Sequence, residues 1–398
     1  MSASAAQFVT EPSVVAQALA APAGGDAHAA LRFGSAGALI AGLSPALADV
    51  VARRYAALLE PVAPALRLDV KRAERAGFRT IDTRGWENTM ALAHDADGVV
   101  VVGRDFVARV DASGKRALVS TWCDDDFAVA PIENTLRIAA AYRSLLRGGV
   151  LLHSCGIVDD DVSASVARIC FGPSGIGKST LAAAWLARGR SILSDELCSI
   201  ERAGGDDGGY EAAQLPFAGD VAAALVPGGA LPLASLHRLA QGPVSRVDAL
   251  GAKDAVTALI GCAPFVNVDR FRLPLLLANL HAVARALPPA KLTLALGDDP
   301  RPLFRAGIHD GARFALARSI RYRVIDDEAV VVLQQSAEVL GLNGTGSRAF
   351  DLAARGRTFK EIVDTIEGDT DVERGVLASD LRAFFADAVR DGLLEVRP

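Results

Sequence analysis

The sequence has few cysteines, and their arrangement excludes two classes of protein. The five cysteines are odd in number, scattered along the chain and never spaced as C-x-x-C. Such a set predicts neither a disulfide framework nor a zinc site. Unpaired cysteines suit a reducing compartment, so we expect a cytoplasmic protein.

Long apolar runs and an excess of basic charge are also absent. The longest candidate for a membrane span, residues 273–287, is interrupted by Asn279, His281 and Arg285. The first residues lack the charged and apolar regions of a signal peptide. Lys and Arg number 42 against 47 Asp and Glu, a net charge of −5. We therefore expect neither a membrane nor a nucleic acid as partner.

The length of 398 residues allows about two to three domains, each with its own core. The alternation of strand-like and helix-like segments predicts an α/β protein. We expect a loose N-terminus over residues 1–30, an N-terminal α/β domain over 31–130 and a phosphate-loop domain over 131–300. A linker over 301–314 and a C-terminal domain over 315–398 follow. The oligomeric state stays open, with a homo-oligomer among the options.

The segment GPSGIGKST fits the phosphate-binding pattern G-x-x-x-x-G-K-[ST] at every fixed position. A buried strand is predicted before it, over 166–171, and an alanine-rich helix after it, over 179–188. Backbone N–H groups at the helix start would point at phosphate oxygens. We expect ATP and Mg²⁺ here, with Lys178 on the β- and γ-phosphates and Ser179 on the metal. The expected nucleotide-binding residues are Gly172, Pro173, Ser174, Gly175, Ile176, Gly177, Lys178, Ser179 and Thr180. A glycine-rich turn without a ligand is the structural alternative.

Two adjacent carboxylates follow the next predicted strand, residues 191–194. In a parallel sheet, Asp195 and Glu196 would lie at the edge where the phosphate loop lies. We assign Asp195 as the base that accepts the proton of an attacking hydroxyl, and Glu196 as the group on the metal side. The alternative is a metal-only pair in a nucleotide hydrolase.

A histidine lies in the strand that precedes the loop strand. His153 is in the middle of the apolar run 150–158, which a polar turn joins to residues 166–171 as a hairpin. A lone histidine in such a run is usually a core residue. Because its strand directly precedes the loop strand, it could instead orient or tune Asp195. We also expect an amphipathic helix over 132–146, a loop-rich region after residue 209 and a helix near 273–287.

These motifs, in this order, resemble the HPr kinase-like family, relatives of phosphoenolpyruvate carboxykinase. The resemblance covers roughly residues 130–300 and rests on His153-Ser-Cys-Gly-Ile-Val, the phosphate loop, and Arg188-Gly-Arg-Ser-Ile-Leu-Ser-Asp195-Glu196. Pro216-Phe217-x-Gly219 and Gln241-Gly242-Pro243 look like the HPr-kinase-related proteins of peptide-modification gene clusters. The resemblance implies a phosphate-loop kinase core, with His153 and Asp195 as catalytic residues and Lys178 and Ser179 as ATP·Mg²⁺ ligands.

The chain departs from that family in two places. Glu196 stands where the family has a second Asp, and the family's Glu-x-Arg-Gly-x-Gly run is absent. The second departure argues against HPr itself as substrate and leaves a transition-state arginine unassigned, with Arg246 as a weak candidate.

The last 80 residues follow a different pattern. Three short strands are predicted over 320–325, 329–333 and 337–342, followed by three helices. Thr358 and Glu361 form the signature of a capping box before the second helix. The third helix, near Leu377–Val389, carries charges of both signs and is no basic recognition helix. We expect a compact winged-helix-like domain that does not bind DNA.

Residues 315–396 resemble a PqqD-like module, the leader-peptide recognition element of ribosomally made, modified peptides. The resemblance rests on residues 321–326, on 341–350 and on 358–366. It implies that an extended leader peptide adds to the strand Ala337–Leu342 and packs against the third helix.

A kinase-like site and a peptide-docking module in one chain favour one function. We expect an ATP- and Mg²⁺-dependent kinase that phosphorylates a Ser or Thr hydroxyl of a precursor peptide whose leader the C-terminal domain holds. One alternative is a small-molecule or sugar kinase with a merely structural C-terminal domain. Another is a non-catalytic, ATP-regulated peptide-binding or chaperone subunit.

Overall fold

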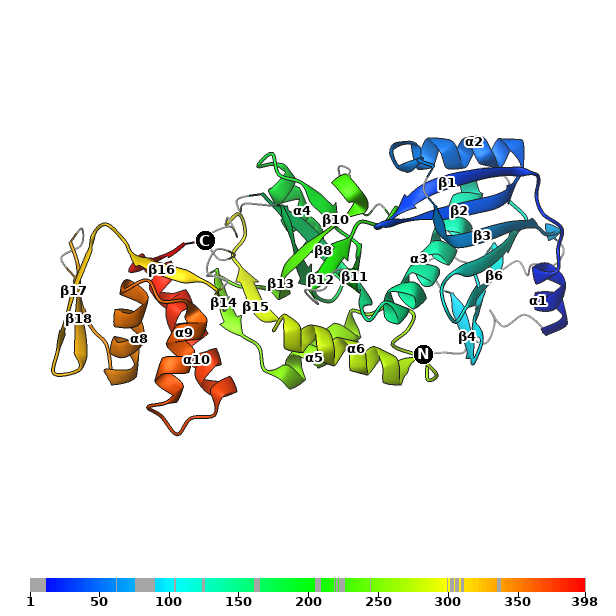
Figure 1. The fold of residues 1–398 in the computed structure, drawn as a ribbon. Coiled ribbons are helices and arrows are strands. Elements are labelled where there is room, and N and C mark those ends of the chain that lie inside the picture. Colours follow the sequence, from blue (N-terminus) through cyan, green and yellow to red (C-terminus); the bar gives the residue numbers. More distant parts are fainter. Residues whose placement is uncertain are drawn as a thin grey trace. The chain divides into compact units, whose positions relative to one another are not determined.

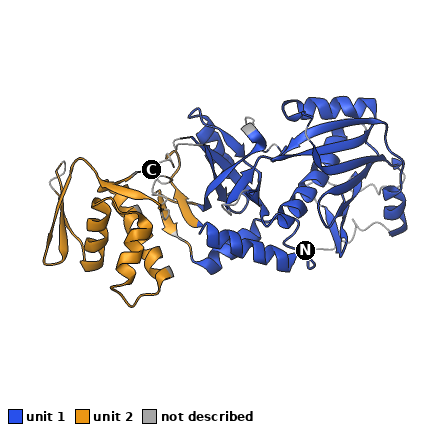
Figure 2. Ribbon diagram, viewed as in Figure 1, with its two compact units in different colours: residues 1–239, 251–289 blue, residues 240–250, 290–398 orange. Residues whose placement is uncertain are grey.

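The computed structural model describes residues 12–61, 63–75, 90–103, 105–123, 126–160, 165–204, 209–217, 219, 221, 226–243, 245–298, 300, 304, 308, 311–334 and 338–397. Its contacts divide the chain into two compact units (Figure 2). Unit 1 comprises residues 1–239 and 251–289, and unit 2 comprises residues 240–250 and 290–398. Each unit has its own hydrophobic core. The finer division into domains stays a prediction.

The first sheet of unit 1 comes from the N-terminal part of the chain (Figure 1). Its strands are β1 (Ala27–Phe33), β2 (Ala36–Leu43), β3 (Pro64–Arg72), β4 (Ala91–Asp95), β5 (Gly98–Val102), β6 (Phe106–Asp111) and β7 (Arg116–Thr121). They lie in the order β1-β2-β3-β7-β6-β5-β4. β3 runs parallel to β2 and β7, and the remaining neighbours are antiparallel. Helices α1 (Pro12–Leu19) and α2 (Pro45–Arg54) contact this sheet.

The segment predicted to be a loose terminus contains regular structure. Helix α1 and the start of β1 lie within residues 1–30. For these described residues the prediction is wrong, because β1 pairs with β2 along its whole length. The alanines of β1 have low intrinsic β-propensity, so the sequence did not predict a strand here. The strand forms because its backbone groups pair with β2.

Helix α3 (Val129–Leu146) lies between the two sheets of unit 1. It contacts β6 and β7 of the first sheet and β8 and β11 of the second. The helix predicted over 132–146 is confirmed, but two of its charged residues are buried, since Glu133 is only 7% exposed and Arg143 only 8%. Burial also lowers the pKa of Arg143. A helix covered from two sides is buried around most of its circumference.

The second sheet of unit 1 carries the segment predicted to be a phosphate loop. Its strands are β8 (Val150–Asp159), β9 (Val166–Phe171), β10 (Ile192–Ser194), β11 (Leu197–Arg202), β12 (Tyr210–Ala213) and β13 (Ala230–Gln241). β8 pairs antiparallel with β9, with β10 and with β11. β11 pairs with β12, β12 pairs with β13, and β13 runs parallel to β9. Five strands therefore form a closed ring, in the order β8, β11, β12, β13 and β9, with β9 pairing again with β8.

The loop-rich region predicted after residue 209 is instead largely regular. It holds β12, β13 and helix α5 (Ala252–Gly261). β13 consists mainly of Ala, Leu, Arg and Gln, which favour helix by intrinsic propensity. Pairing with β9 on one side and β12 on the other overrides that preference. The predicted hairpin before the loop is confirmed. So is the helix near 273–287, which is α6 (Leu273–Ala286).

The described residues of unit 2 form short strands and three helices. β14 (Arg246–Ala249) pairs with β15 (Ala290–Leu294), and β16 (Arg313–Leu316) pairs with β20 (Leu394–Arg397). A three-stranded sheet holds β17 (Ile320–Ile325), β18 (Glu328–Leu333) and β19 (Glu338–Gly341) in that order. The helices are α8 (Gly344–Ala354), α9 (Phe359–Glu367) and α10 (Arg374–Arg390). The three predicted strands and three helices are confirmed, and β16 and β20 are additional. Ala337, the first residue of the predicted third strand, lies outside the described residues.

Aromatic side chains form much of the core of unit 2. The rings of Phe314 and Phe385 stack with centroids 4.4 Å apart, and Phe359 meets Phe385 edge to face at 6.2 Å. The capping box at the start of α9 is confirmed. Thr358 Oγ1 accepts from Glu361 N at 3.2 Å, and Glu361 Oε2 accepts from Thr358 N at 2.8 Å. Local hydrogen bonds therefore determine where α9 begins.

The predicted linker over 301–314 is described only in part. Of its described residues, Phe304 is 2% exposed and Ile308 is 7% exposed. Ile308 packs in the core of unit 2. These positions therefore do not have the solvent exposure of a flexible linker.

Candidate functional site

The predicted strand–loop–helix arrangement around the phosphate loop is confirmed. β9 ends at Phe171, and α4 (Lys178–Leu186) begins at Lys178. Gly175 and Gly177 have φ angles of 79° and 105°, in the left-handed region that favours glycine. The stretch Pro173–Gly175 is exposed. The loop therefore presents its backbone to solvent at a helix N-terminus, where N–H groups and the helix dipole favour an anion.

Lys178 lies inside the loop. Its Nζ donates to Gly172 O and to Pro173 O, both at 2.9 Å, and the residue is 6% exposed. Burial lowers the pKa of this ammonium. Ser179, half-buried, and Thr180, exposed, follow in the first turn of α4. An ammonium held by two carbonyls can transfer its hydrogen bonds to phosphate oxygens, which are stronger acceptors.

The register of the second sheet brings Asp195 to the phosphate-loop edge, but not through a parallel sheet as predicted. β9 and β10 both pair antiparallel with β8, with Phe171 opposite Ser154 and Ser194 opposite Gly156. β9 and β10 therefore run in the same direction on either side of β8, and both end near residues 154–156. Two strand spacings put those ends roughly 10 Å apart.

His153 lies between these two strand ends. Its backbone N–H donates to Cys262 O at 2.7 Å. Burial is the main cause that lowers the pKa of its imidazole, and the charges of Lys178 and Arg137 lower it further. The charge of Asp195 and a hydrogen bond with the Glu196 backbone act in the opposite direction. Two of the residues predicted to be catalytic, Lys178 and Asp195, thus act electrostatically on the third, His153, which is neutral at pH 7.

Asp195 is a buried carboxylate in a tight turn. It is 3% exposed, and Ser194 Oγ accepts the backbone N–H groups of Glu196 at 3.0 Å and Leu197 at 3.2 Å. Gly219 packs directly over the carboxylate. A Cβ at that glycine would lie 2.2 Å from Asp195 Oδ1 and 2.8 Å from Oδ2. Only glycine leaves room for the acid in this position.

Glu196 contacts an arginine that the sequence does not single out. Glu196 Oε2 accepts from Arg137 Nη2 at 2.9 Å, and the same nitrogen donates to Glu133 Oε1 at 2.7 Å. A quarter of the Glu196 side chain is exposed. The predicted metal-side carboxylate therefore already accepts a charge-assisted hydrogen bond.

The residues present fit a Mg²⁺·nucleotide in which the nucleotide supplies most of the metal ligands. Within the described ranges, no three His, Cys, Asp or Glu side chains gather closely enough to hold a metal ion. Magnesium in phosphoryl-transfer sites is commonly held by one or two protein groups together with substrate phosphates. Ser179, at the start of α4, and the partly exposed carboxylate of Glu196 are the groups available for that role.

Sequence reasoning missed Arg137 and Cys262. Arg137 lies 59 residues before Glu196, and its only local signal is an ordinary pairing with Glu133 one helical turn earlier. Burial raises the pKa of the Cys262 thiol, while the charge of Lys178 and a hydrogen bond with the Gly172 backbone lower it. The weak arginine candidate, Arg246, lies in unit 2 and pairs with Asp248 at 2.9 Å.

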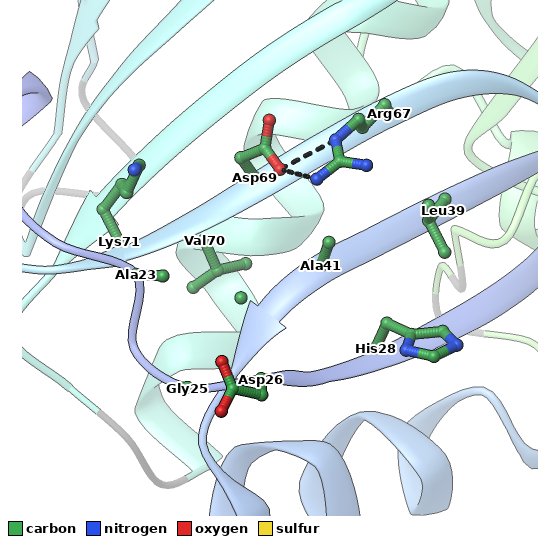
Figure 3. A pocket seen from close by; sticks show the side chains of 11 residues that line it. Ala23, Gly25, Asp26, His28, Leu39, Ala41, Arg67, Asp69, Val70 and Lys71 are labelled. Carbon is green, nitrogen blue, oxygen red and sulfur yellow. Dashed lines mark hydrogen bonds and ion pairs between the residues drawn. The ribbon is translucent and has the colours of Figure 1, made fainter.

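A pocket of about 570 Å³ lies elsewhere in unit 1, on the first sheet (Figure 3). It is lined by β1, β2, β3 and the segment before β1. Arg67 and Asp69 pair with each other in it at 2.8 Å, and Asp26, His28 and Lys71 also line it. None of the predicted site residues lines this pocket, and its mixture of charges indicates no particular ligand.

β19 forms an edge of its three-stranded sheet in unit 2. Leu342 N donates to Ala329 O at 2.9 Å, and Leu340 lies opposite Val331. Because inward and outward groups alternate along an antiparallel strand, the N–H groups of Val339 and Gly341 point away from β18. Val339 is also 62% exposed. This edge can accept a further strand.

No helix among the described residues is long and apolar enough to cross a membrane.

Comparison with known proteins assigns the C-terminal part of the chain. Residues 328–394 match the family described as coenzyme PQQ synthesis protein D (PqqD). They run from β18 to the first residue of β20. The chain therefore ends in a PqqD domain, as the sequence resemblance implies.

Two solved structures are similar to part of this chain. One, titled "TbiB1 in Complex with the TbiA(beta) Leader Peptide", is 33% identical and covers 20% of this chain and 94% of its own, with a TM-score of 0.20. The other, "Lasso peptide synthetase B1 complexed with the leader peptide", is 21% identical and covers 22% of this chain and 99% of its own, also with a TM-score of 0.20. The comparison with curated proteins finds no match.

Proposed function

We propose that this protein is an ATP- and Mg²⁺-dependent kinase with an HPr kinase-like core, which phosphorylates a Ser or Thr hydroxyl of a ribosomally made precursor peptide. One observation carries the proposal. A phosphate-loop motif with Lys178 and Asp195 both in electrostatic reach of His153 occurs in the same chain as a PqqD domain. The first feature suits phosphoryl transfer, and the second suits capture of a leader peptide.

Asp195 acts as the base in this proposal. The hydroxyl oxygen of the peptide attacks the γ-phosphorus, the bond from that phosphorus to the β–γ bridging oxygen breaks, and ADP leaves. The hydroxyl proton passes to Asp195. Neutral His153, within electrostatic reach of that acid, orients it. Lys178 moves its hydrogen bonds from the loop carbonyls to the phosphates. Ser179 and Glu196 would hold Mg²⁺, which would neutralise charge on the transferring group.

The C-terminal domain would hold the substrate. A leader peptide that adds to β19 hydrogen-bonds to the outward N–H and C=O groups of Val339 and Gly341, and α10 supplies side-chain contacts, as the PqqD-like resemblance implies. Tethering raises the local concentration of the core peptide, so the phosphate-loop site need not bind it tightly by itself.

Incubation with the precursor peptide encoded next to this chain's gene, together with Mg²⁺ and ATP, tests the proposal. We expect a product heavier by about 80 Da, one HPO₃ group. Asp195→Asn should abolish that product and retain nucleotide binding. An unchanged mass with every adjacent precursor would count against peptide phosphorylation.

Two variants separate the leading proposal from its alternatives. Val339→Pro removes an outward N–H and leaves the β18–β19 pairing intact, so it should weaken leader binding and slow transfer. Leu340→Pro, which removes an inward N–H, is the matched variant that disrupts β19 itself. A small-molecule or sugar kinase would keep its rate in Val339→Pro. A non-catalytic peptide-binding subunit would keep its function in Asp195→Asn and lose it in Lys178→Ala.

A further inference from the structure

Arg137 joins two carboxylates in unit 1, and one of them is in the candidate site. Its Nη2 donates to Glu133 Oε1 at 2.7 Å and to Glu196 Oε2 at 2.9 Å. Only 18% of its side chain is exposed. The guanidinium also lies over the ring of Phe217, with Cζ 5.5 Å from the ring centroid. Arg137 is therefore held in one place by contacts on several sides.

Glu133 anchors the arginine from the far side. Its Oε2 accepts from Arg54 Nη2 at 3.0 Å and from Tyr55 Oη at 3.4 Å, and both donors lie at the end of α2. Glu133 also raises the pKa of Tyr55, after burial, which is the larger cause. With partners on both oxygens, Glu133 cannot move freely. A chain of charged contacts thus runs from α2 through α3 to the turn at Glu196.

Arg137 also acts on the rest of the site. Its charge lowers the pKa of His153, so it lies within electrostatic reach of that imidazole. Its Nε is buried without a hydrogen-bond partner among the described residues. A buried unmatched donor is costly and marks a position where an acceptor would be stabilised.

We propose that Arg137 is a positioning residue that holds Glu196 in the site and competes with Mg²⁺ for its carboxylate. The proposal rests on the function proposed above. Glu196 Oε2 cannot keep a short hydrogen bond from a cation and also ligate a divalent metal at full strength, because both draw on the same lone pairs. With Glu196 engaged on a metal ion, the Arg137–Glu196 contact would weaken, and the planar guanidinium of Arg137 would be better able to bind phosphate oxygens.

Competition between Arg137 and Mg²⁺ has a consequence that a merely structural role of Arg137 would not have. Removal of Arg137 should tighten the binding of Mg²⁺ in the presence of nucleotide, because Glu196 loses its competitor. Phosphoryl transfer should become slower in the same variant, because the carboxylate and His153 lose a fixed neighbour. A structural defect would weaken both metal binding and transfer.

Calorimetric titration of the full chain with a non-hydrolysable ATP analogue, at stepwise Mg²⁺ concentrations, tests the proposal. For Arg137→Gln we expect half-maximal analogue binding at about fivefold less Mg²⁺, as fits the loss of one partly exposed ion pair. Arg137→Lys should lower the Mg²⁺ concentration for half-maximal analogue binding by about twofold. If Arg137→Gln does not fold, Arg137→Lys tests the proposal in its place.

Arg147→Gln is the matched control, since Arg147 follows the same helix and pairs with Glu201 and Glu211 instead. It should leave the Mg²⁺ requirement unchanged. An unchanged or higher requirement in the folded Arg137 variants, or an equal shift in Arg147→Gln, overturns this inference alone. Failure of the unaltered chain to bind the analogue at any Mg²⁺ concentration overturns the proposed function, and this inference with it.

Discussion

The contact between Gly219 and Asp195 provides the sharpest test of the candidate base. In Gly219→Ala the new Cβ would lie 2.2 Å from Asp195 Oδ1 and 2.7 Å from Cγ. Ordinary contacts of a Cβ begin near 3.4 Å. Either the carboxylate or the backbone at residue 219 must therefore move by about 1 Å, a displacement that can cost a catalysed step about 100-fold.

We expect the kcat for phosphorylation of the precursor peptide to fall by about 100-fold, or roughly 2.7 kcal/mol in the activation barrier. The KM for ATP should change little, because the atoms nearest to the new Cβ belong to Asp195 and not to the phosphate loop. The initial rate of product formation, followed by mass spectrometry, measures the effect. Melting temperatures of both proteins show whether the variant is folded.

Gly209→Ala is the matched control, since a Cβ at that glycine meets nothing within 4 Å. It should keep the full rate. A folded Gly219→Ala protein with an undiminished kcat would refute the assignment, because the proposed base would then tolerate a displacement that phosphoryl transfer should not.

Three further changes have expected outcomes. Lys178→Ala should weaken binding of the Mg²⁺·ATP analogue by about 10- to 100-fold, measured by calorimetry, and unchanged affinity would exclude the lysine from the phosphate site. Burial lowers the pKa of His237 to about 3. Below about pH 6.5 the His237 imidazole therefore takes up a proton in the unfolded state but stays neutral in the folded state. The free energy of unfolding should for this reason fall by about 2 kcal/mol between pH 7 and pH 5. Urea titrations of His237→Gln should show a smaller fall, and an equal fall would contradict this reading. Thr358→Ala should destabilise unit 2 by about 1 kcal/mol through loss of the cap on α9, and an unchanged melting temperature would show that the cap contributes nothing.

Much of the secondary structure could be predicted because it depends on patterns among residues close together in the sequence. Alternating apolar residues, caps and glycines located most of the predicted helices and strands to within a few residues. β13 could not be predicted, because its residues favour helix and only its pairing with β9 and β12 makes it a strand. The burial of Glu133 and Arg143 on α3 could not be predicted, because the packing of two sheets around one helix leaves no trace in its own sequence.

The sequence by itself determined the local geometry of the phosphate loop and of the α9 cap. Gly175 and Gly177 permit left-handed backbone angles, and Thr358 and Glu361 satisfy each other's backbone groups, so these features depend on near neighbours alone.

Only the tertiary structure decided what surrounds the loop. The common pairing of β9 and β10 with β8 brings Asp195 to that edge, and the packing of α3 brings Arg137 to Glu196 from 59 residues away. Gly219 approaches Asp195 in the same way, across a distant part of the chain. Such contacts depend on strand register and helix packing, which arise from burial summed over the whole unit and not from any short stretch of residues.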